Sequence, residues 1–318
     1  MKARNIIKTP NIMAWVLLAL MPGIAGMTYY FGVGILWNVF WLSAFSLATE
    51  VFVVVIRTGT LAPSALQAPM LNNIGDGSTF LAAWLIAICL PPFVEVDILT
   101  IAAVTAIGLA KHAYGGLGNN IFNPAMVGYA VILLSFPQAL AAWPALGGVE
   151  NLAADTLSGA TYLSEFRYRD AMTVDEFLLN NPQVMHQQII AGLFLLGGLS
   201  LIYLRIISWR IPLALLLTVG LLASVTYDQG STQSMGSAWF HWTTGGTIAA
   251  AFFVATDPVT HPSRPSHQII FAISIGILLF VIRTQGNLPD GIAFAVLLAN
   301  CTTPLLNRIH RQRQSQHV

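Results

Sequence analysis

Charged side chains are scarce in this chain of 318 residues, since Asp, Glu, Lys and Arg together make up only 8% of it. A soluble globular protein carries about 25% charged residues, and so small a share cannot cover the surface of a soluble domain of this size. The scarcity excludes a soluble enzyme, a disordered chain and a nucleic-acid-binding protein with a basic face. With 56% hydrophobic residues, the composition is typical of an integral membrane protein.

Cysteine is equally rare, because Cys89 and Cys301 are the only two and both lie in apolar runs. Alone they supply neither an iron–sulfur cluster nor a zinc site. His261 and His267 flank Arg264 without a companion at metal-ligand spacing, so no metal site is expected. Any redox chemistry of this chain must therefore use a group other than cysteine.

Long apolar runs fill most of the sequence. A helix needs roughly 20 residues to cross about 30 Å of hydrocarbon, and fewer where it is broken inside a bundle. We predict an all-α polytopic membrane protein with ten transmembrane helices, of which the third, fourth, fifth and eighth are short, and no removable signal peptide. The ten runs are Ile12–Tyr30, Val33–Ile56, Thr79–Leu90, Ile98–Ala110, Ile121–Phe136, Gln188–Leu204, Pro212–Tyr227, Thr244–Ala255, Gln268–Ile282 and Gly291–Leu306.

The basic residues indicate the orientation, because cytoplasmic loops carry an excess of Lys and Arg. With the N-terminus inside, eleven of the 14 fall in the cytoplasm and three outside. Both termini are then cytoplasmic and the polar segment 138–187 is extracytoplasmic; nine or eleven spans would split the charges less cleanly. The inner residues are Lys2, Arg4, Lys8, Arg57, Lys111, Arg205, Arg210, Arg264, Arg308, Arg311 and Arg313, and the outer ones are Arg167, Arg169 and Arg283.

The sequences on the two sides of that segment resemble each other. Asp76-Gly77-Ser78 opens a short apolar run that closes at Leu90-Pro91-Pro92, and Thr244-Gly245-Gly246 opens another that closes at Asp257-Pro258. Small or capping residues begin helices and proline ends them. Five spans on each side give two inverted repeats, 1–137 and 188–318. This pattern indicates a ligand site near the middle of the membrane, although glycine-rich short helices also serve close packing alone.

Three acids lie in or beside these spans. Glu50 is well inside the second run, and an intramembrane acid marks an ion or proton path unless it is a protonated or hydrogen-bonded structural group. Asp76 is expected to cap the third helix. Asp257 stands at a helix end, where the negative dipole favours a cation or ligand partner, so Glu50 and Asp257 are the two candidates for an ion path.

The external segment contains Asp155-Thr156-Leu157-Ser158-Gly159-Ala160-Thr161. A hydroxyl is a weak nucleophile and no histidine lies near it in sequence, so the turn does not suggest Ser or Thr catalysis of its own. The seven residues match the pattern D-x-x-[ST]-G-A-[ST] that flavin transferases use to join FMN to the last hydroxyl through a phosphodiester bond. The match predicts Thr161 as the acceptor. Asp155 and Ser158 would be recognised by the transferase, and Gly159 and Ala160 would keep the turn narrow enough to reach its active site.

Two further motifs accompany it, one at 111–125 (KHAYGGLGNNIFNPA) and one at 252–260 (FFVATDPVT). Together the three resemble the RnfD family, the D subunits of the Rnf electron-transport complex, over nearly the whole chain. The related B subunit of the sodium-translocating NADH:quinone reductase shares them but carries a longer N-terminal extension than the ten or so residues found here.

The resemblance implies a subunit of the bacterial cytoplasmic (inner) membrane that relays electrons through FMN on Thr161, coupled to ion translocation. It also implies partner subunits bearing flavin and iron–sulfur centres, a flavin transferase for maturation, and in some relatives a noncovalent riboflavin near Asn123 and Lys111. The chain would then be part of an enzyme rather than a complete one. The alternatives are the quinone-reductase B subunit and a secondary transporter, whose common architecture is also an inverted repeat.

Some of these residues also have plainer interpretations. Asn123-Pro124 reads as an ordinary helix cap with proline in the first turn. Lys111 and His112 are expected mainly as surface anchors at the cytoplasmic mouth, and the Arg308–Arg313 cluster as an anchor on anionic lipid.

Overall fold

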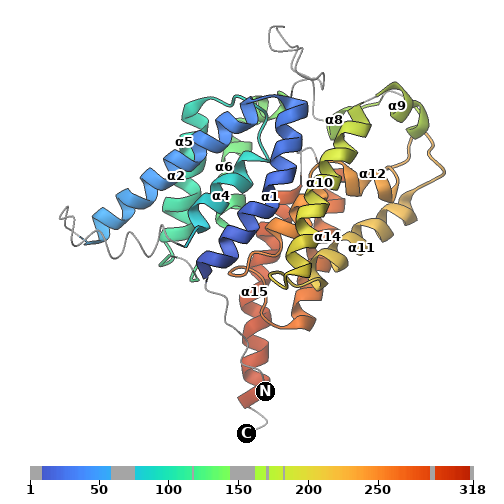
Figure 1. Ribbon diagram of the computed structural model, residues 1–318. Helices are drawn as coiled ribbons and strands as arrows, with labels where there is room; N and C mark the ends of the chain where they lie inside the picture. Colours follow the sequence, from blue (N-terminus) through green and yellow to red (C-terminus); the bar gives the residue numbers. More distant parts are fainter. Residues whose placement is uncertain are drawn as a thin grey trace.

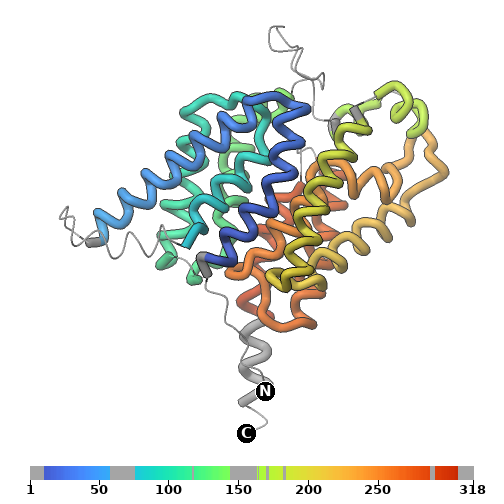
Figure 2. The backbone as a smooth tube through the Cα atoms, in the orientation of Figure 1, coloured from blue at the N-terminus to red at the C-terminus, as the bar shows by residue number. Residues whose placement is uncertain are grey.

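The computed structural model describes residues 9–58, 76–116, 118–143, 162–169, 172–181, 183–286 and 291–315. Within these ranges the secondary structure is helical, which confirms the all-α prediction. Figure 2 shows the half of the chain before segment 138–187 on one side and the half after it on the other. In Figure 1, α1 begins and α15 ends toward the same end of the molecule, while α8 and α9 lie at the opposite end.

The first half contains α1 (Thr9–Phe31), α2 (Gly34–Thr58), α4 (Ser78–Ala87), α5 (Val96–Ala103), the π-helix η1 (Val104–His112), α6 (Pro124–Ser135) and α7 (Pro137–Ala141). Segment 138–187 supplies α8 (Tyr162–Arg167) and α9 (Val174–Asn180). The second half contains α10 (Gln183–Tyr203), α11 (Arg210–Thr226), α12 (Ala238–Thr243), α13 (Thr247–Ala249), the π-helix η3 (Ala250–Val254), α14 (Pro265–Gln285) and α15 (Ile292–Ser315).

All ten predicted apolar runs coincide with helical segments. Four helices among the described residues are long and apolar enough to cross a membrane, namely 11–31, 34–57, 184–203 and 265–285. The others are shorter, as expected for four of the ten runs, but Arg210–Thr226 and Ile292–Leu306 are also below that length. Length and composition therefore account for four spans directly.

Local chemistry explains the starts of the short helices. Gly77 and Gly246 precede α4 and α13 with φ of +73° and +70°, a left-handed conformation that favours glycine. Asp76 was expected to be the cap of α4; the cap is Gly77, and the Asp76 carboxylate accepts the Ser78 N–H at 2.7 Å. The helix α6 begins at Pro124, three residues after the predicted start, because Asn123 caps it.

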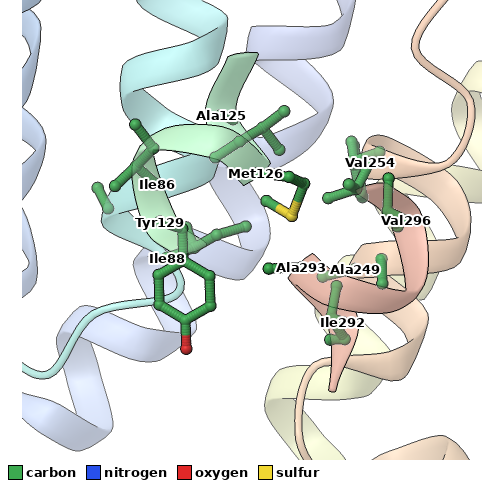
Figure 3. Packing of buried hydrophobic residues seen from close by; sticks show 14 of the residues in the cluster. Ile86, Ile88, Ala125, Met126, Tyr129, Ala249, Val254, Ile292, Ala293 and Val296 are labelled. Atoms are coloured by element: carbon green, nitrogen blue, oxygen red, sulfur yellow. The ribbon is translucent and has the colours of Figure 1, made fainter. Parts of the chain in front are cut away.

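Pairs of helices pack in a similar order in the two halves. In the first half α2 packs on α4, α5 and η1, and η1 packs on α6; in the second α11 packs on α12, α14 and η3, and α14 on α15. The halves meet where α1 packs on α10 and α6 on α15. Figure 3 shows the second contact, with Ala125, Met126 and Tyr129 of α6 facing the residues Val254 of η3 and Ala293 and Val296 of α15.

Glycines allow α1 and α10 to approach closely. A Cβ on Gly197 of α10 would lie 1.9 Å from the Ala19 carbonyl oxygen of α1, and a Cβ on Gly23 of α1 would lie 2.3 Å from the Phe194 ring. Small residues at such contacts let backbones come together in lipid, where packing rather than water exclusion drives helix association.

We expect Gly197→Ala to force α1 and α10 apart, because the clash is with backbone and cannot be relieved by a rotamer change. The free energy of unfolding should fall by about 1–3 kcal/mol, as for other overpacked interiors. Thermal unfolding in detergent measures it. Gly192→Ala on the same helix is the control, since a Cβ there meets nothing within 4 Å; equal midpoints for the two variants would contradict the close packing.

Candidate functional site

A buried polar cluster joins α2, α4 and η1 near the end of α2. The Glu50 side chain is fully buried, and Lys111 Nζ lies 2.8 Å from its Oε1 and 3.1 Å from its Oε2. Lys111 also donates to Thr79 Oγ1 at 2.9 Å, and the Thr79 hydroxyl donates to Glu50. The His112 ring nitrogen Nε2 lies 3.2 Å from Glu50 Oε1. The elements α4 and η1 thus place two nitrogens and one hydroxyl around the single carboxylate of α2.

The π-helix η1 carries Lys111 and His112 to this position. A π-helix takes more residues per turn than an α-helix and is found frequently at functional sites. Arg57, seven residues after Glu50 on α2, donates to the His112 carbonyl, so α2 holds the end of η1 at two points.

The expectation that Lys111 and His112 are surface anchors is wrong. Their exposed fractions are 2% and 3%, because the Lys111 ammonium group and the His112 ring nitrogen Nε2 point at Glu50. The sequence could not reveal this pairing, since Glu50 and Lys111 are 61 residues apart.

Asn123 connects the two halves. Its Oδ1 accepts the N–H groups of Ala125 and Met126 at 3.0 and 3.3 Å, as a helix cap does, and its Nδ2 donates to the Val254 carbonyl of η3 at 3.3 Å. These bonds engage both ends of the amide, so the cap that the sequence predicts also bridges to the second π-helix.

Asn300 of α15 was not identified from the sequence. Its exposed fraction is 0%, and neither its Oδ1 nor its Nδ2 has a hydrogen-bond partner among the described residues. Asn300 follows Ala293 and Val296 by seven and four residues, which places it on the face of α15 that carries them. That face meets α6 and η3 (Figure 3). A buried amide without a partner costs about 1–3 kcal/mol, so this position suits a polar ligand.

Asp257 organises the turn after η3. Its carboxylate accepts the Thr260 hydroxyl at 2.9 Å and the Val259 N–H at 3.3 Å. Burial raises the pKa of Asp257, and the Thr260 hydroxyl opposes the shift. Thr303 of α15 donates to the Thr260 carbonyl at 3.0 Å, which ties this turn to the last helix. Asp257 forms no salt bridge within the part of the chain that the structure describes. It follows η3 in the second half, whereas Glu50 lies on α2 in the first half.

The predicted flavin-attachment residues Asp155, Ser158, Gly159, Ala160 and Thr161 lie outside the described residues. The chain is described again from Tyr162, where α8 begins. A small apolar cluster of Phe166, Val174, Phe177 and Phe240 joins α8 and α9 to α12.

Arg169 fixes α8 to the second half. Its guanidinium donates to the carbonyl oxygens of Phe166, Met172, Ser231, Thr232 and Ser234 at 2.6–3.3 Å. It also lies 4.3 Å from the centre of the Phe166 ring. Five carbonyls from two segments therefore share one cation, which makes α8 a firmly placed helix although it has only six residues.

Comparisons with known proteins agree with the motifs. The model of the NQR2, RnfD, RnfE family matches residues 2–316. The D subunit of the ion-translocating oxidoreductase complex of Ectopseudomonas mendocina is 35% identical over 99% of this chain and 94% of its own length. Those of Pseudomonas aeruginosa and Mannheimia succiniciproducens are each 36% identical, over 99% and 96% of this chain and 94% and 93% of their own lengths. Similarity at this level reaches from the first helix to the last, and the chain belongs to the NQR2, RnfD, RnfE family.

Proposed function

We propose that this chain is the membrane-embedded D subunit of an Rnf-type ion-translocating oxidoreductase complex and relays electrons through FMN bound covalently to Thr161. The observation that carries the proposal is the complete D-x-x-[ST]-G-A-[ST] motif at 155–161 in a chain of this family. FMN supplies electron transfer, while the protein supplies position and electrostatics.

The anchoring of α8 supports the attachment site. Thr161 is joined directly to Tyr162, and α8 is held by the Arg169 carbonyl contacts and the Phe166 cluster. A cofactor attached next to a fixed helix stays within a limited volume, which electron transfer to a partner subunit requires. The charge distribution supports an extracytoplasmic position for this segment, as does the place of α8 and α9 at the end of the molecule opposite the end of α15 (Figure 1).

The similar packing order of the two halves supports ten spans in two inverted repeats. Under the correspondence of α1 with α10 and α6 with α15, the two largest helix contacts between the halves each join equivalent helices. The short helices α4 and α13 then begin from opposite sides of the membrane, each behind a left-handed glycine.

The ion path is proposed to pass Glu50, with Asp257 as a second acid on the way. Three neighbouring groups, Lys111, His112 and Thr79, compete for the Glu50 carboxylate. A cation can therefore bind there only when the ammonium group of Lys111 moves away, which gives the cluster two alternative states.

A noncovalent riboflavin is proposed between the halves, where the family resemblance expects it near Asn123 and Lys111. Asn123 and Lys111 are engaged by protein groups, whereas the Asn300 amide offers a donor and an acceptor on the same interface. A flavin edge presents both kinds of group.

Partner subunits with flavin and iron–sulfur centres would supply and accept the electrons, and a flavin transferase would attach the FMN. The chain alone is then not a complete enzyme. The quinone-reductase B subunit is the alternative within the family, and quinone reduction by the assembled complex would favour it. A secondary transporter is the alternative outside it, and absence of flavin would favour that.

Thr161→Ala should abolish covalent attachment, because it removes the hydroxyl that forms the phosphodiester bond. The measurement is in-gel fluorescence after denaturation of protein co-expressed with a flavin transferase, with peptide mass mapping of 155–167. Thr156→Ala is the control, since this position is variable in the motif. A fluorescent band in Thr161→Ala would refute the assignment.

Glu50→Gln should retain covalent FMN and lose most ion transport, because the amide removes the charge that a cation needs. Ion uptake, both of Na⁺ and of H⁺, is measured in inverted membrane vesicles that contain the whole complex. Glu50→Gln alone leaves the Lys111 ammonium group buried without its partner. The double variant Glu50→Gln and Lys111→Gln removes that charge as well, so loss of transport in both variants is due to the missing carboxylate. Asp257→Asn tests the second acid. Glu95→Gln changes an exposed acid and serves as control; normal transport in both Glu50 variants would exclude the path.

Asn300→Leu should remove noncovalent riboflavin and leave covalent FMN in place. Acid extraction followed by chromatography of the released flavin measures both. Ser46→Ala alters another buried polar atom without a partner in the described part of the chain and should keep the riboflavin. Full riboflavin content in Asn300→Leu would show that the ligand lies elsewhere.

A further inference from the structure

The Lys111 ammonium group lies among oxygen atoms, as a bound metal cation does. Its Nζ is 2.8 Å and 3.1 Å from the two carboxylate oxygens of Glu50 and 2.9 Å from Thr79 Oγ1. All three side chains are buried. Hard metal cations in proteins take carboxylate and neutral oxygen atoms as ligands. The cluster therefore supplies the donor atoms of a cation site, and Lys111 occupies it with a charge of its own.

A further oxygen lies one helical turn from Glu50 on α2. Ser46 precedes Glu50 by four residues, and both have an exposed fraction of 0%, which places them on the same buried face of the helix. Side chains at this spacing have Cβ atoms about 5–6 Å apart. The Ser46 hydroxyl and the Glu50 carboxylate are therefore close enough to share one cation as ligands.

The Ser46 hydroxyl has no hydrogen-bond partner among the described residues. Two other hydroxyls of the same helix do have one. Ser43 donates to the Val39 carbonyl at 2.6 Å, and Thr49 donates to the Phe45 carbonyl at 2.8 Å. In each case the acceptor is four residues back, a bond that serine and threonine commonly make inside helices. A buried hydroxyl without a partner is unfavourable, so Ser46 indicates a polar group or an ion beside it.

The single carboxylate sets the charge of the cation. In its pair with Lys111, Glu50 carries one negative charge, while the hydroxyls of Thr79 and Ser46 are neutral. A monovalent cation in place of the ammonium group keeps this balance. A divalent ion would add a positive charge away from water, which is costly. The cluster therefore suits an ion with the charge of Na⁺.

We propose that Glu50, Thr79 and Ser46 bind a monovalent metal cation such as Na⁺, and that the Lys111 ammonium group fills this site whenever the cation is absent. The proposal rests on the proposed function, in which Glu50 lies on the ion path. It adds two hydroxyl ligands to that path and makes Lys111 a tethered cation that competes with the transported one.

The test follows thermal unfolding of the purified full-length chain in detergent, with choline chloride replaced stepwise by NaCl at constant ionic strength. A ligand that binds the folded state raises its unfolding temperature. Lys111→Met removes the competing ammonium group, so its unfolding temperature should rise with the Na⁺ concentration. Half of the rise should need at least ten-fold less Na⁺ than in the wild type. Lys111→Arg keeps a tethered cation and should respond like the wild type.

Further substitutions in the Lys111→Met chain identify the ligands. Ser46→Ala and Thr79→Val should each raise the Na⁺ concentration at half effect several-fold, because each removes one oxygen. Ser43→Ala is the matched control, since its hydroxyl already donates to a backbone carbonyl, and it should leave that concentration unchanged. Adding Glu50→Gln should abolish the Na⁺ response. A residue with a purely structural role would instead shift the unfolding temperature equally at every Na⁺ concentration.

An unfolding temperature of Lys111→Met that does not depend on Na⁺, or equal effects of Ser46→Ala and Ser43→Ala, would overturn the proposal. Ion transport by the whole complex is measured separately in Glu50→Gln. Lost transport in that variant, combined with no Na⁺ response in Lys111→Met, would remove the metal-cation site and leave Glu50 as a proton carrier on the path. Normal transport in Glu50→Gln would instead overturn the ion path on which the proposal rests.

Discussion

Hydrocarbon offers no water to a buried carboxylate, so the protein itself must neutralise Glu50. The groups that do so come from α4 and η1, and α2 is the least buried of the four long apolar helices. Apolar contact alone would leave its position weakly defined. The polar cluster at one end, together with the Asn38 amide that donates to the Pro91 carbonyl and accepts the Val94 N–H, sets where α2 lies. Removing one partner of such a cluster leaves an uncompensated charge, which costs more than the pair contributes.

Composition and periodicity were sufficient to predict the helices. Each apolar run became helical because nothing else satisfies the backbone in lipid, and glycine, asparagine and proline marked the starts of α4, α6 and α13. The π-helices could not be predicted, because Val104–His112 and Ala250–Val254 read as ordinary apolar helix. The helices α8, α9 and α12 were also missed, since they are short and their stability comes from the shared Phe166–Phe240 packing rather than from a periodic pattern.

Single residues of the candidate site were predicted, but their partners were not. Glu50 was identified from its position in a span, and Lys111 from its motif, yet only the fold brings them to 2.8 Å. Asn300 carried no local signal, because an asparagine in a helix is common. Packing between elements that are distant in sequence decides these partners, and such contacts cannot be predicted from one sequence.

The bond from Asn123 to the Val254 carbonyl affects how the two halves can move relative to each other. Widening a helix turn to π geometry alters which carbonyls find a donor inside the helix, and here a residue of the opposite half supplies one of them. The same amide caps α6. If the halves slid past each other, the bond from the Asn123 amide to the Val254 carbonyl would break, while the cap of α6, which Asn123 makes within its own half, would remain. The residue that fixes the start of α6 is thus also a point at which one half holds the other, so a displacement of η3 acts directly on the first turn of α6.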